Sequence, residues 1–338
     1  SSFVNRFLDH QTPVEELLED TRDQVTSSFP YQHKKIAIPE QLFCVVGEQR
    51  KNALGIDLDS TLETDALLSS IKQIPPLTAH PIIDGESIEA ELHSAYNPAD
   101  HEQLIGHYSN ASEKDILRAL ESAYKAQPDW NALGHSARAE FLDKVADLME
   151  RDSAELIGVI ANEGGRTLRD GISEVREAVD FCRYYALQTR ALQTRALQTP
   201  ALPTQRLQGH GVFLCISPWN FPLAIFVGQI AAALAAGNTV VAKPAAQTPA
   251  IAAAAIRLFH QAGVPGAALH LLLGSGSLIG KLLISDSRVA GIAFTGSTVT
   301  AQRINQQLAA RPGGPIPFIA ETGGQNCMVV DSTALPEQ

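Results

Sequence analysis

Residues 212–243 read VFLCISPWNFPLAIFVGQIAAALAAGNTVVAK, and they predict a strand, a helix and a second strand in succession. Residues 212–217 form an apolar, β-branched run that is typical of a buried strand. The alanine-rich residues 223–236 predict a helix that ends at Gly237, because glycine favours the left-handed conformation that closes helices. Residues 239–242 then predict another buried strand.

The same alternation continues through the rest of the chain. Further helices are expected at 250–261, 277–283 and 301–309, and further strands at 269–273, 289–294, 316–320 and 328–330. Short buried strands joined by helices are typical of an α/β fold with a doubly wound, Rossmann-like parallel sheet. In such sheets ligands bind at the carboxyl ends of the strands, where the strand order reverses.

The chain before residue 212 has a different character. Prolines interrupt residues 1–85, which we interpret as a mostly helical connecting arm. A strand-like run at 104–108 is followed by a helix capping box, Ser112 to Asp115. After this capping box, Ile116, Leu117, Leu120 and Tyr124 recur at helical spacing and predict a helix. The same kind of spacing predicts further helices at 136–149 and 171–185. We therefore predict three parts: an arm at 1–85, a nucleotide-binding domain at 86–331, and the start of another domain at 332–338.

Residues 186–205 form a five-residue repeat, ALQTR, ALQTR, ALQTP, ALPTQ. A period of five matches neither a helix nor a strand over a long stretch. We interpret the repeat as a surface insertion, and a specific docking loop is the alternative.

Composition excludes several classes of protein. The 338 residues carry 37 acidic and 26 basic side chains, a net charge of -11, and no basic stripe that could follow a nucleic acid. No apolar run reaches the ~20 residues of a membrane-spanning helix, and the first residues do not resemble a secretory signal. We expect a cytoplasmic location. The four cysteines lack the spacing of a zinc site or a disulfide framework, so we expect no metal and buried free thiols.

Unusual residues follow several of the predicted strands. These are SPWNFP at 217–222, Lys243 with Pro244, FTGST at 294–298 and ETGG at 321–324. The run GSGSLIG at 274–280 follows a strand and opens a helix, a position suited to a dinucleotide phosphate. Its last spacing is one residue longer than the usual dinucleotide fingerprint, so it indicates little alone.

Taken together and in this order, these motifs resemble the aldehyde dehydrogenase superfamily over residues 97–331. The segments 217–226, 228–238 and 319–324, with the opening 1–6, are similar to the bifunctional proline dehydrogenase/aldehyde dehydrogenase flavoproteins. The resemblance implies NAD(P)-dependent oxidation of glutamate γ-semialdehyde, which equilibrates with pyrroline-5-carboxylate, to glutamate in proline catabolism. It also implies partners in cis: a proline dehydrogenase barrel with FAD before residue 1, and a catalytic domain with the nucleophilic cysteine after Gln338. We expect this segment alone to be inactive and the complete protein to be a homo-oligomer.

The resemblance assigns roles to individual residues. Asn220 would donate to the oxyanion, and Glu321 would be the general base that releases the thioester. Lys243 would bind the adenosine ribose, and Gly296 and Ser297 the pyrophosphate. The remaining cofactor residues would be Ile216, Ser217, Pro218, Trp219, Gly276, Gly280, Phe294, Thr295 and Gly323. The aldehyde substrate would meet Phe221, Phe181 and Glu163.

Some of these residues have a plainer interpretation. Asn220 could satisfy the backbone of its own turn, Glu321 could be a solvated loop acid, and Trp219 could pack in the core, as could Phe181 and Phe221.

Two points stay open at the level of sequence. Many members of the superfamily carry a glutamate three positions after the lysine, where this chain has Ala246, so NAD is expected and NADP is possible. A non-catalytic nucleotide-binding or interaction module that retains the fold is the alternative function.

Overall fold

The computed structural model describes residues 7–9, 11–18, 36–46, 48, 50–198, 208–324, 328, 330 and 331. The chain forms two compact units, residues 1–52 and 53–338. The first contains helix α2 (Val14–Leu17) and the 3₁₀ helix η1 (Pro39–Val46). The strand predicted at 328–330 lies only partly within the described residues, and Cys327 lies outside them.

The second unit is built around a seven-stranded sheet with the order β10-β9-β6-β7-β8-β2-β3. Its strands are β2 (Ile82–Ile83), β3 (Glu86–Ser87), β6 (Val212–Ile216), β7 (Thr239–Lys243), β8 (Leu269–Leu271), β9 (Val289–Thr295) and β10 (Phe318–Glu321). Strands β6 to β10 pair in parallel, and β2 and β3 add an antiparallel edge. The order reverses between β6 and β9, which confirms the predicted doubly wound arrangement.

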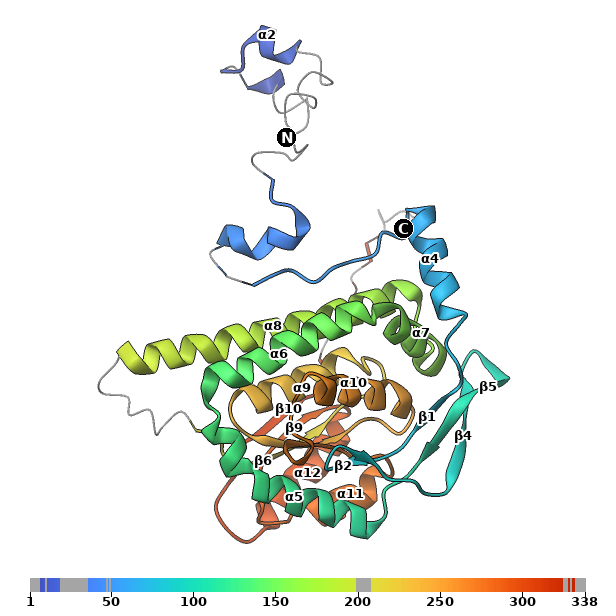
Figure 1. The fold of residues 1–338 in the computed structure, drawn as a ribbon, viewed down its shortest axis with the longest axis vertical. Coiled ribbons are helices and arrows are strands. Elements are labelled where there is room, and N and C mark those ends of the chain that lie inside the picture. Colours follow the sequence, from blue (N-terminus) through green and yellow to red (C-terminus); the bar gives the residue numbers. More distant parts are fainter. Residues whose placement is uncertain are drawn as a thin grey trace. The chain divides into compact units, whose positions relative to one another are not determined.

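Helices cover both faces of this sheet, as the alternation of elements predicts (Figure 1). They are α5 (Glu113–Ala132), α6 (Gly134–Arg151), α7 (Ser153–Gly164), α8 (Leu168–Gln198), α9 (Ala224–Ala235), α10 (Pro249–Gln261), α11 (Gly276–Leu283) and α12 (Thr298–Ala310), and α4 (Thr61–Ile71) precedes them. Successive residues of β6 point to opposite faces, with Phe213 and Cys215 in one core and Val212 and Leu214 in the other.

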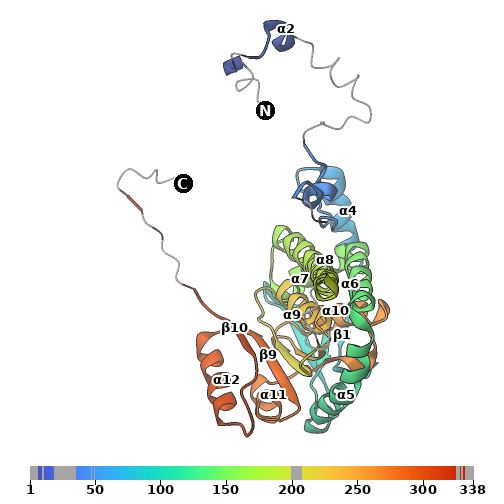
Figure 2. The same cartoon turned by 90° about the vertical axis from the view of Figure 1, so that its left-hand side faces the viewer.

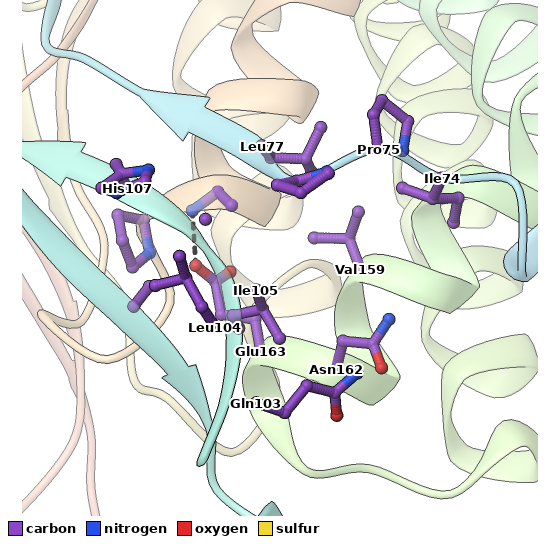
Figure 3. Close-up of a pocket in the computed structure, with 15 residues that line it drawn as sticks. Ile74, Pro75, Leu77, Gln103, Leu104, Ile105, His107, Val159, Asn162 and Glu163 are labelled. Carbon is purple, nitrogen blue, oxygen red and sulfur yellow. Dashed lines mark hydrogen bonds between the residues drawn. The ribbon is translucent and has the colours of Figure 1, made fainter. Parts of the chain in front are cut away.

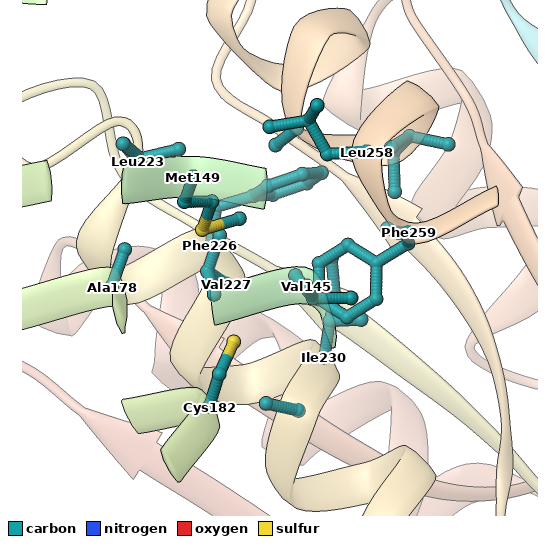
Figure 4. Close-up of a cluster of buried hydrophobic side chains, with 14 of the residues drawn as sticks. Val145, Met149, Ala178, Cys182, Leu223, Phe226, Val227, Ile230, Leu258 and Phe259 are labelled. Carbon is teal, nitrogen blue, oxygen red and sulfur yellow. The ribbon is translucent and has the colours of Figure 1, made fainter. Parts of the chain in front are cut away.

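The two cores are formed by different helices. Buried side chains of α6, α8, α9 and α10 pack together in the larger core, where Figure 4 shows Met149, Cys182, Phe226 and Phe259. Side chains of α5, α11 and α12 form the other core against the opposite face, and Figure 2 shows α11 and α12 beside β9 and β10. Burial of apolar surface on both faces accounts for the nearly continuous apolar strands of the sequence.

A second, smaller sheet has the order β1-β5-β4. Its strands are β1 (Leu77–Ala79), β4 (Leu92–Asn97) and β5 (Asp100–Ser109). Strand β1 lies so close to β5 that a side chain at Gly106 would collide with the backbone of Leu77. Strands β1 and β2 thus come from the stretch that was interpreted as a connecting arm, and this compact unit already begins at Ala53. Strands of only two or three residues next to prolines carry too short a pattern to be recognised in the sequence.

The predicted capping box starts α5. The Ser112 hydroxyl accepts from the Asp115 N–H at 3.2 Å, and the Asp115 carboxylate accepts from the Ser112 N–H at 3.0 Å. Ile116 and Leu120 are buried as expected. Leu117 and Tyr124 are exposed, because alanines at 119 and 123 complete the buried face in their place.

The interpretation of the five-residue repeat was wrong for its first part. Helix α8 continues through the repeat to Gln198, since alanine, leucine, glutamine and arginine all favour helices. The first copy is docked: the Thr189 hydroxyl donates to the Ala235 carbonyl at 3.0 Å, and Arg190 pairs with Asp143 at 2.6 Å. Side-chain contacts with distant helices thus hold a segment whose period alone predicts no regular structure.

No helix in the part of the chain that the structure describes is long and apolar enough to cross a bilayer. The same described residues contain no cluster of side chains arranged to hold a metal ion. Cys182 and Cys215 are buried thiols, as predicted, whereas Cys44 is exposed. Burial raises the pKa of both buried thiols, so neither is a reactive thiolate.

Candidate functional site

A cavity of about 920 Å³ lies where the strand order reverses. It is formed by the carboxyl ends of β6, β7, β9 and β10 together with α11 and α12. Every predicted cofactor residue and both predicted catalytic residues line it: Ile216, Ser217, Pro218, Trp219, Asn220, Lys243, Gly276, Gly280, Phe294, Thr295, Gly296, Ser297, Glu321 and Gly323. The structure therefore brings together residues that are about a hundred positions apart in the sequence.

The SPWNFP turn connects β6 to α9 and presents its side chains to the cavity. Trp219 is 54% exposed, so it does not pack in the core. The side chain of Asn220 is exposed and has no hydrogen-bond partner among the described residues. The plainer interpretation of Asn220, a side chain that satisfies its own turn, therefore does not hold there.

Glu174 on α8 fixes the far end of this turn. Its carboxylate accepts from the backbone N–H groups of Leu223 at 3.1 Å and Ala224 at 3.4 Å, at the start of α9. Arg166 lies 3.6 Å from the same carboxylate and 4.9 Å from the ring of Phe221. Sequence reasoning missed Glu174, although an acidic residue on the apolar face next to Val175 was a signal for such a role.

Gln229 on α9 is a second positioning residue that sequence reasoning missed. Its side-chain amide donates to the Ile216 carbonyl at 3.3 Å and to the Thr295 hydroxyl at 3.1 Å. It therefore joins the carboxyl ends of β6 and β9, the two strands between which the order reverses. A polar residue inside an otherwise apolar helix was the available signal.

Lys243 supplies a buried positive charge at the end of β7. Its ammonium donates to the Pro244 carbonyl at 2.7 Å, and it has no acidic partner in the described part of the chain. Burial lowers the pKa of Lys243 to about 8. A methyl group on Gly276 would lie 3.6 Å from the Lys243 side chain, so the lysine passes directly over the first residue of α11.

The ends of β9 and β10 meet at the start of α12. The Gly296 N–H donates to the Glu321 carbonyl at 3.1 Å, and a side chain at Gly296 would collide with the Phe294 ring. Ser297 is the N-cap of α12, and its hydroxyl accepts from the Thr300 N–H at 3.2 Å. The free N–H groups of the first turn of α12 thus lie beside the cavity, where a helix favours anions.

The predicted substrate residues do not line this cavity. Phe181 stacks on Tyr185, with ring centroids 6.1 Å apart, and its ring lies against Gly228. Phe221 lies under the Arg166 guanidinium. Glu163 accepts from the backbone N–H groups of Ala250 at 2.7 Å and Ile251 at 2.9 Å and so caps α10. Their contact with a substrate stays a prediction.

The burial of Glu163 leads to a prediction of how the stability of the fold depends on pH. Burial raises its pKa from 4.5 to about 7, more than the two N–H donors lower it. Between these pH values the unfolded chain has lost a proton that the folded protein keeps, so the free energy of unfolding falls as pH rises. We expect the melting temperature to fall more steeply from pH 5 to pH 7 in the wild type than in Glu163→Gln, as measured by calorimetry. Parallel curves would contradict this explanation.

The chain belongs to the aldehyde dehydrogenase family, whose family model matches residues 83–337. It is 42% identical over 349 residues to the bifunctional protein PutA of Klebsiella aerogenes, a match that covers 100% of this chain and 26% of that protein. It is 34% identical over 260 residues to 1-pyrroline-5-carboxylate dehydrogenase of Bacillus cereus, covering 75% of this chain and 50% of that enzyme. The chain therefore spans about a quarter of the PutA relative and half of the dehydrogenase.

A solved structure shows the same similarity. The crystal structure of bifunctional proline utilization A matches with a TM-score of 0.78 and 39% identity, covering 100% of this chain and 32% of that chain. The resemblance that the motifs indicated is thus confirmed at the level of the family and of this group of relatives.

Proposed function

We propose that this chain is the nucleotide-binding part of an NAD(P)-dependent dehydrogenase that oxidises glutamate γ-semialdehyde to glutamate in proline catabolism. The observation that carries the proposal is the single cavity at the strand-order reversal, lined by Asn220, Lys243 and Glu321 together. The names of the PutA and 1-pyrroline-5-carboxylate dehydrogenase relatives support the substrate. We also propose a cytoplasmic location and a homo-oligomer for the complete protein.

The residues of the cavity fit a nicotinamide dinucleotide. Lys243 is a buried cation without an acidic partner among the described residues, and its ammonium can donate to ribose hydroxyls. The first turn of α12 offers backbone N–H groups to a pyrophosphate. A bound dinucleotide would supply the hydride acceptor for the oxidation. Ala246 provides no carboxylate that would exclude a 2′-phosphate, so we propose NAD with NADP as an alternative.

The protein's own groups would act on the acyl part of the reaction. The Asn220 amide donates to the oxygen of the aldehyde as negative charge develops there. The Glu321 carboxylate takes a proton from the water that releases the product acid. The attacking thiol comes from outside the described residues, because Cys182 and Cys215 are buried with raised pKa values and none of the described cysteines lines the cavity.

Loss of the Lys243 ammonium should weaken dinucleotide binding. We expect Lys243→Ala to raise the Kd for NAD by about tenfold or more, because a charge-assisted hydrogen bond in a buried site is lost. Calorimetric titration of the 338-residue chain measures this. Lys114→Ala, an exposed lysine outside the cavity, is the control and should bind like the wild type. Equal affinities for Lys243→Ala and the wild type would refute the cofactor site.

The source of the thiol can be tested by activity. We expect the 338-residue chain to form no NADH from glutamate γ-semialdehyde, and a longer protein that includes the catalytic domain to be active. Cys327, which lies outside the described residues, precedes the apolar run Met328 to Val330, so its replacement by alanine should leave the longer protein active. Activity of the 338-residue chain that disappears in Cys327→Ala would identify Cys327 as the nucleophile instead.

A further inference from the structure

A second cavity, of about 180 Å³, lies apart from the dinucleotide site. It is lined by residues of α7, β1, β5 and the start of α10 (Figure 3). Its lining combines apolar and polar residues; the apolar ones include Ile74, Pro76, Leu77, Ile105 and Val159, and the polar ones are Gln103, His107, Asn162 and Glu163. No residue lines both this cavity and the larger one.

The walls of this cavity are held by regular structure. Strands β1 and β5 pair in parallel, with Leu77 opposite Gly106. The close approach of these two strands leaves no space for a side chain at Gly106. Val159 and Glu163 lie one turn apart on α7 and both face the cavity. The cavity is therefore preformed, as is usual for small-molecule sites.

One wall of the cavity carries the carboxylate of Glu163 (Figure 3). The residue is only 7% exposed, and each of its oxygens accepts one backbone N–H, from Ala250 and from Ile251. A carboxylate offers about four acceptor positions, so about two are left. In the described ranges no lysine or arginine forms an ion pair with Glu163.

Above a pH of about 7, at which Glu163 is ionised, this arrangement leaves a negative charge beside the apolar part of the wall. Burial of an unpaired carboxylate is costly, which is why burial raises the pKa of Glu163 to about 7. A bound cation with an apolar body would supply the missing positive charge and cover the apolar wall at once. A metal ion alone would leave the contacts with Leu77, Ile105 and Val159 unmade.

We propose that this cavity binds a small organic ammonium ion, with its nitrogen at Glu163 and its hydrocarbon part against Leu77, Ile105 and Val159. The volume of about 180 Å³ resembles that of cavities of roughly 150 Å³ that accept benzene, so the ligand has a body about the size of one ring. The site is independent of the proposed dehydrogenase function, because it uses none of the residues that line the dinucleotide cavity.

A pair of probes with the same ring tests the charge. Cyclopentylamine is protonated at neutral pH, and cyclopentanol is its neutral counterpart. We expect calorimetric titration of the 338-residue chain to show binding of the amine at least about tenfold tighter than of the alcohol. Glu163→Gln should abolish this preference. Glu174→Gln is the control: this carboxylate caps α9 as Glu163 caps α10, is also buried and does not line the cavity, so the preference should remain.

A second variant tests the location. Val159→Phe fills the cavity and should abolish binding of both probes, and it decides the question if Glu163→Gln does not fold. Equal affinity for amine and alcohol in the wild type would overturn the proposal, as would amine binding that persists in Val159→Phe. Sodium chloride at the same concentration is the ionic control. The melting temperature of the chain is measured with the amine and with sodium chloride. An equal rise in both would show that an inorganic cation suffices, and this result would also overturn the proposal.

Discussion

Replacement of Asn220 by alanine should lower the turnover number of the complete dehydrogenase by about 10²–10³-fold, as is typical for the loss of one oxyanion donor. Asn220 lines the cavity, is exposed to it, and has no partner for its side-chain amide among the described residues. The amide is therefore available to a developing oxyanion without breaking an existing bond. Steady-state NADH formation with glutamate γ-semialdehyde measures the effect.

The role of Asn220 can be separated from cofactor binding. Because the amide would contact the aldehyde oxygen, Asn220→Ala should leave the Kd for NAD nearly unchanged. Asn305→Ala on α12 is a suitable control, since Asn305 is exposed and does not line the cavity. Its turnover should match the wild type. Unchanged turnover in Asn220→Ala would remove this residue from the mechanism.

The largest effect on stability is expected at Arg138. This side chain on α6 is 1% exposed, and its guanidinium donates to the Ala235 carbonyl at 3.1 Å and to the Asn131 carbonyl at 2.8 Å. Thr189 also donates to Ala235, and the Trp130 ring donates to Leu234 at 3.1 Å. Arg138 and Thr189 satisfy the Ala235 carbonyl at the buried end of α9, whereas the Leu234 carbonyl also accepts from the Gly237 N–H at 3.0 Å.

We expect Arg138→Met to lower the free energy of unfolding by about 3 kcal/mol, because two buried carbonyls lose a charged donor. Urea unfolding followed by circular dichroism measures this change. Arg169→Met, at an exposed arginine of α8, should stay within about 0.5 kcal/mol of the wild type. A loss below about 1 kcal/mol in Arg138→Met would show that water or neighbouring donors replace the guanidinium.

Arg138 also helps to position the turn that carries Asn220, because it contacts the helix that follows this turn. Helix α9 begins directly after the SPWNFP turn; Glu174 accepts from the N–H groups at its start, and Arg138 donates to the carbonyl of its last residue, Ala235. Because α9 is fixed at both ends, the position at which the preceding turn with Asn220 joins the helix is fixed as well. The residues that hold α9 lie on α6 and α8, far from the turn in sequence.

The sequence by itself determined the order of strands and helices from residue 212 to 321, and with it the edge of the sheet where the site lies. Strands 212–217 and 239–242 and helix 223–236 were predicted within one or two residues of β6, β7 and α9. This succeeded because the periodicity of apolar residues and the stop at Gly237 are local properties. The residues after each strand then had to meet, because parallel strands end at one edge.

Only the tertiary structure decided what depends on partners far along the chain. Helix α8 runs into the five-residue repeat, where Thr189 and Arg190 dock on α9 and α6. The antiparallel strand β2 pairs with β8 across almost two hundred residues. Glu163 caps α10 and does not line the dinucleotide cavity. In each case a hydrogen bond joins groups that no local sequence pattern connects. The sequence shows which groups can donate or accept, but only the tertiary structure shows which of them pair.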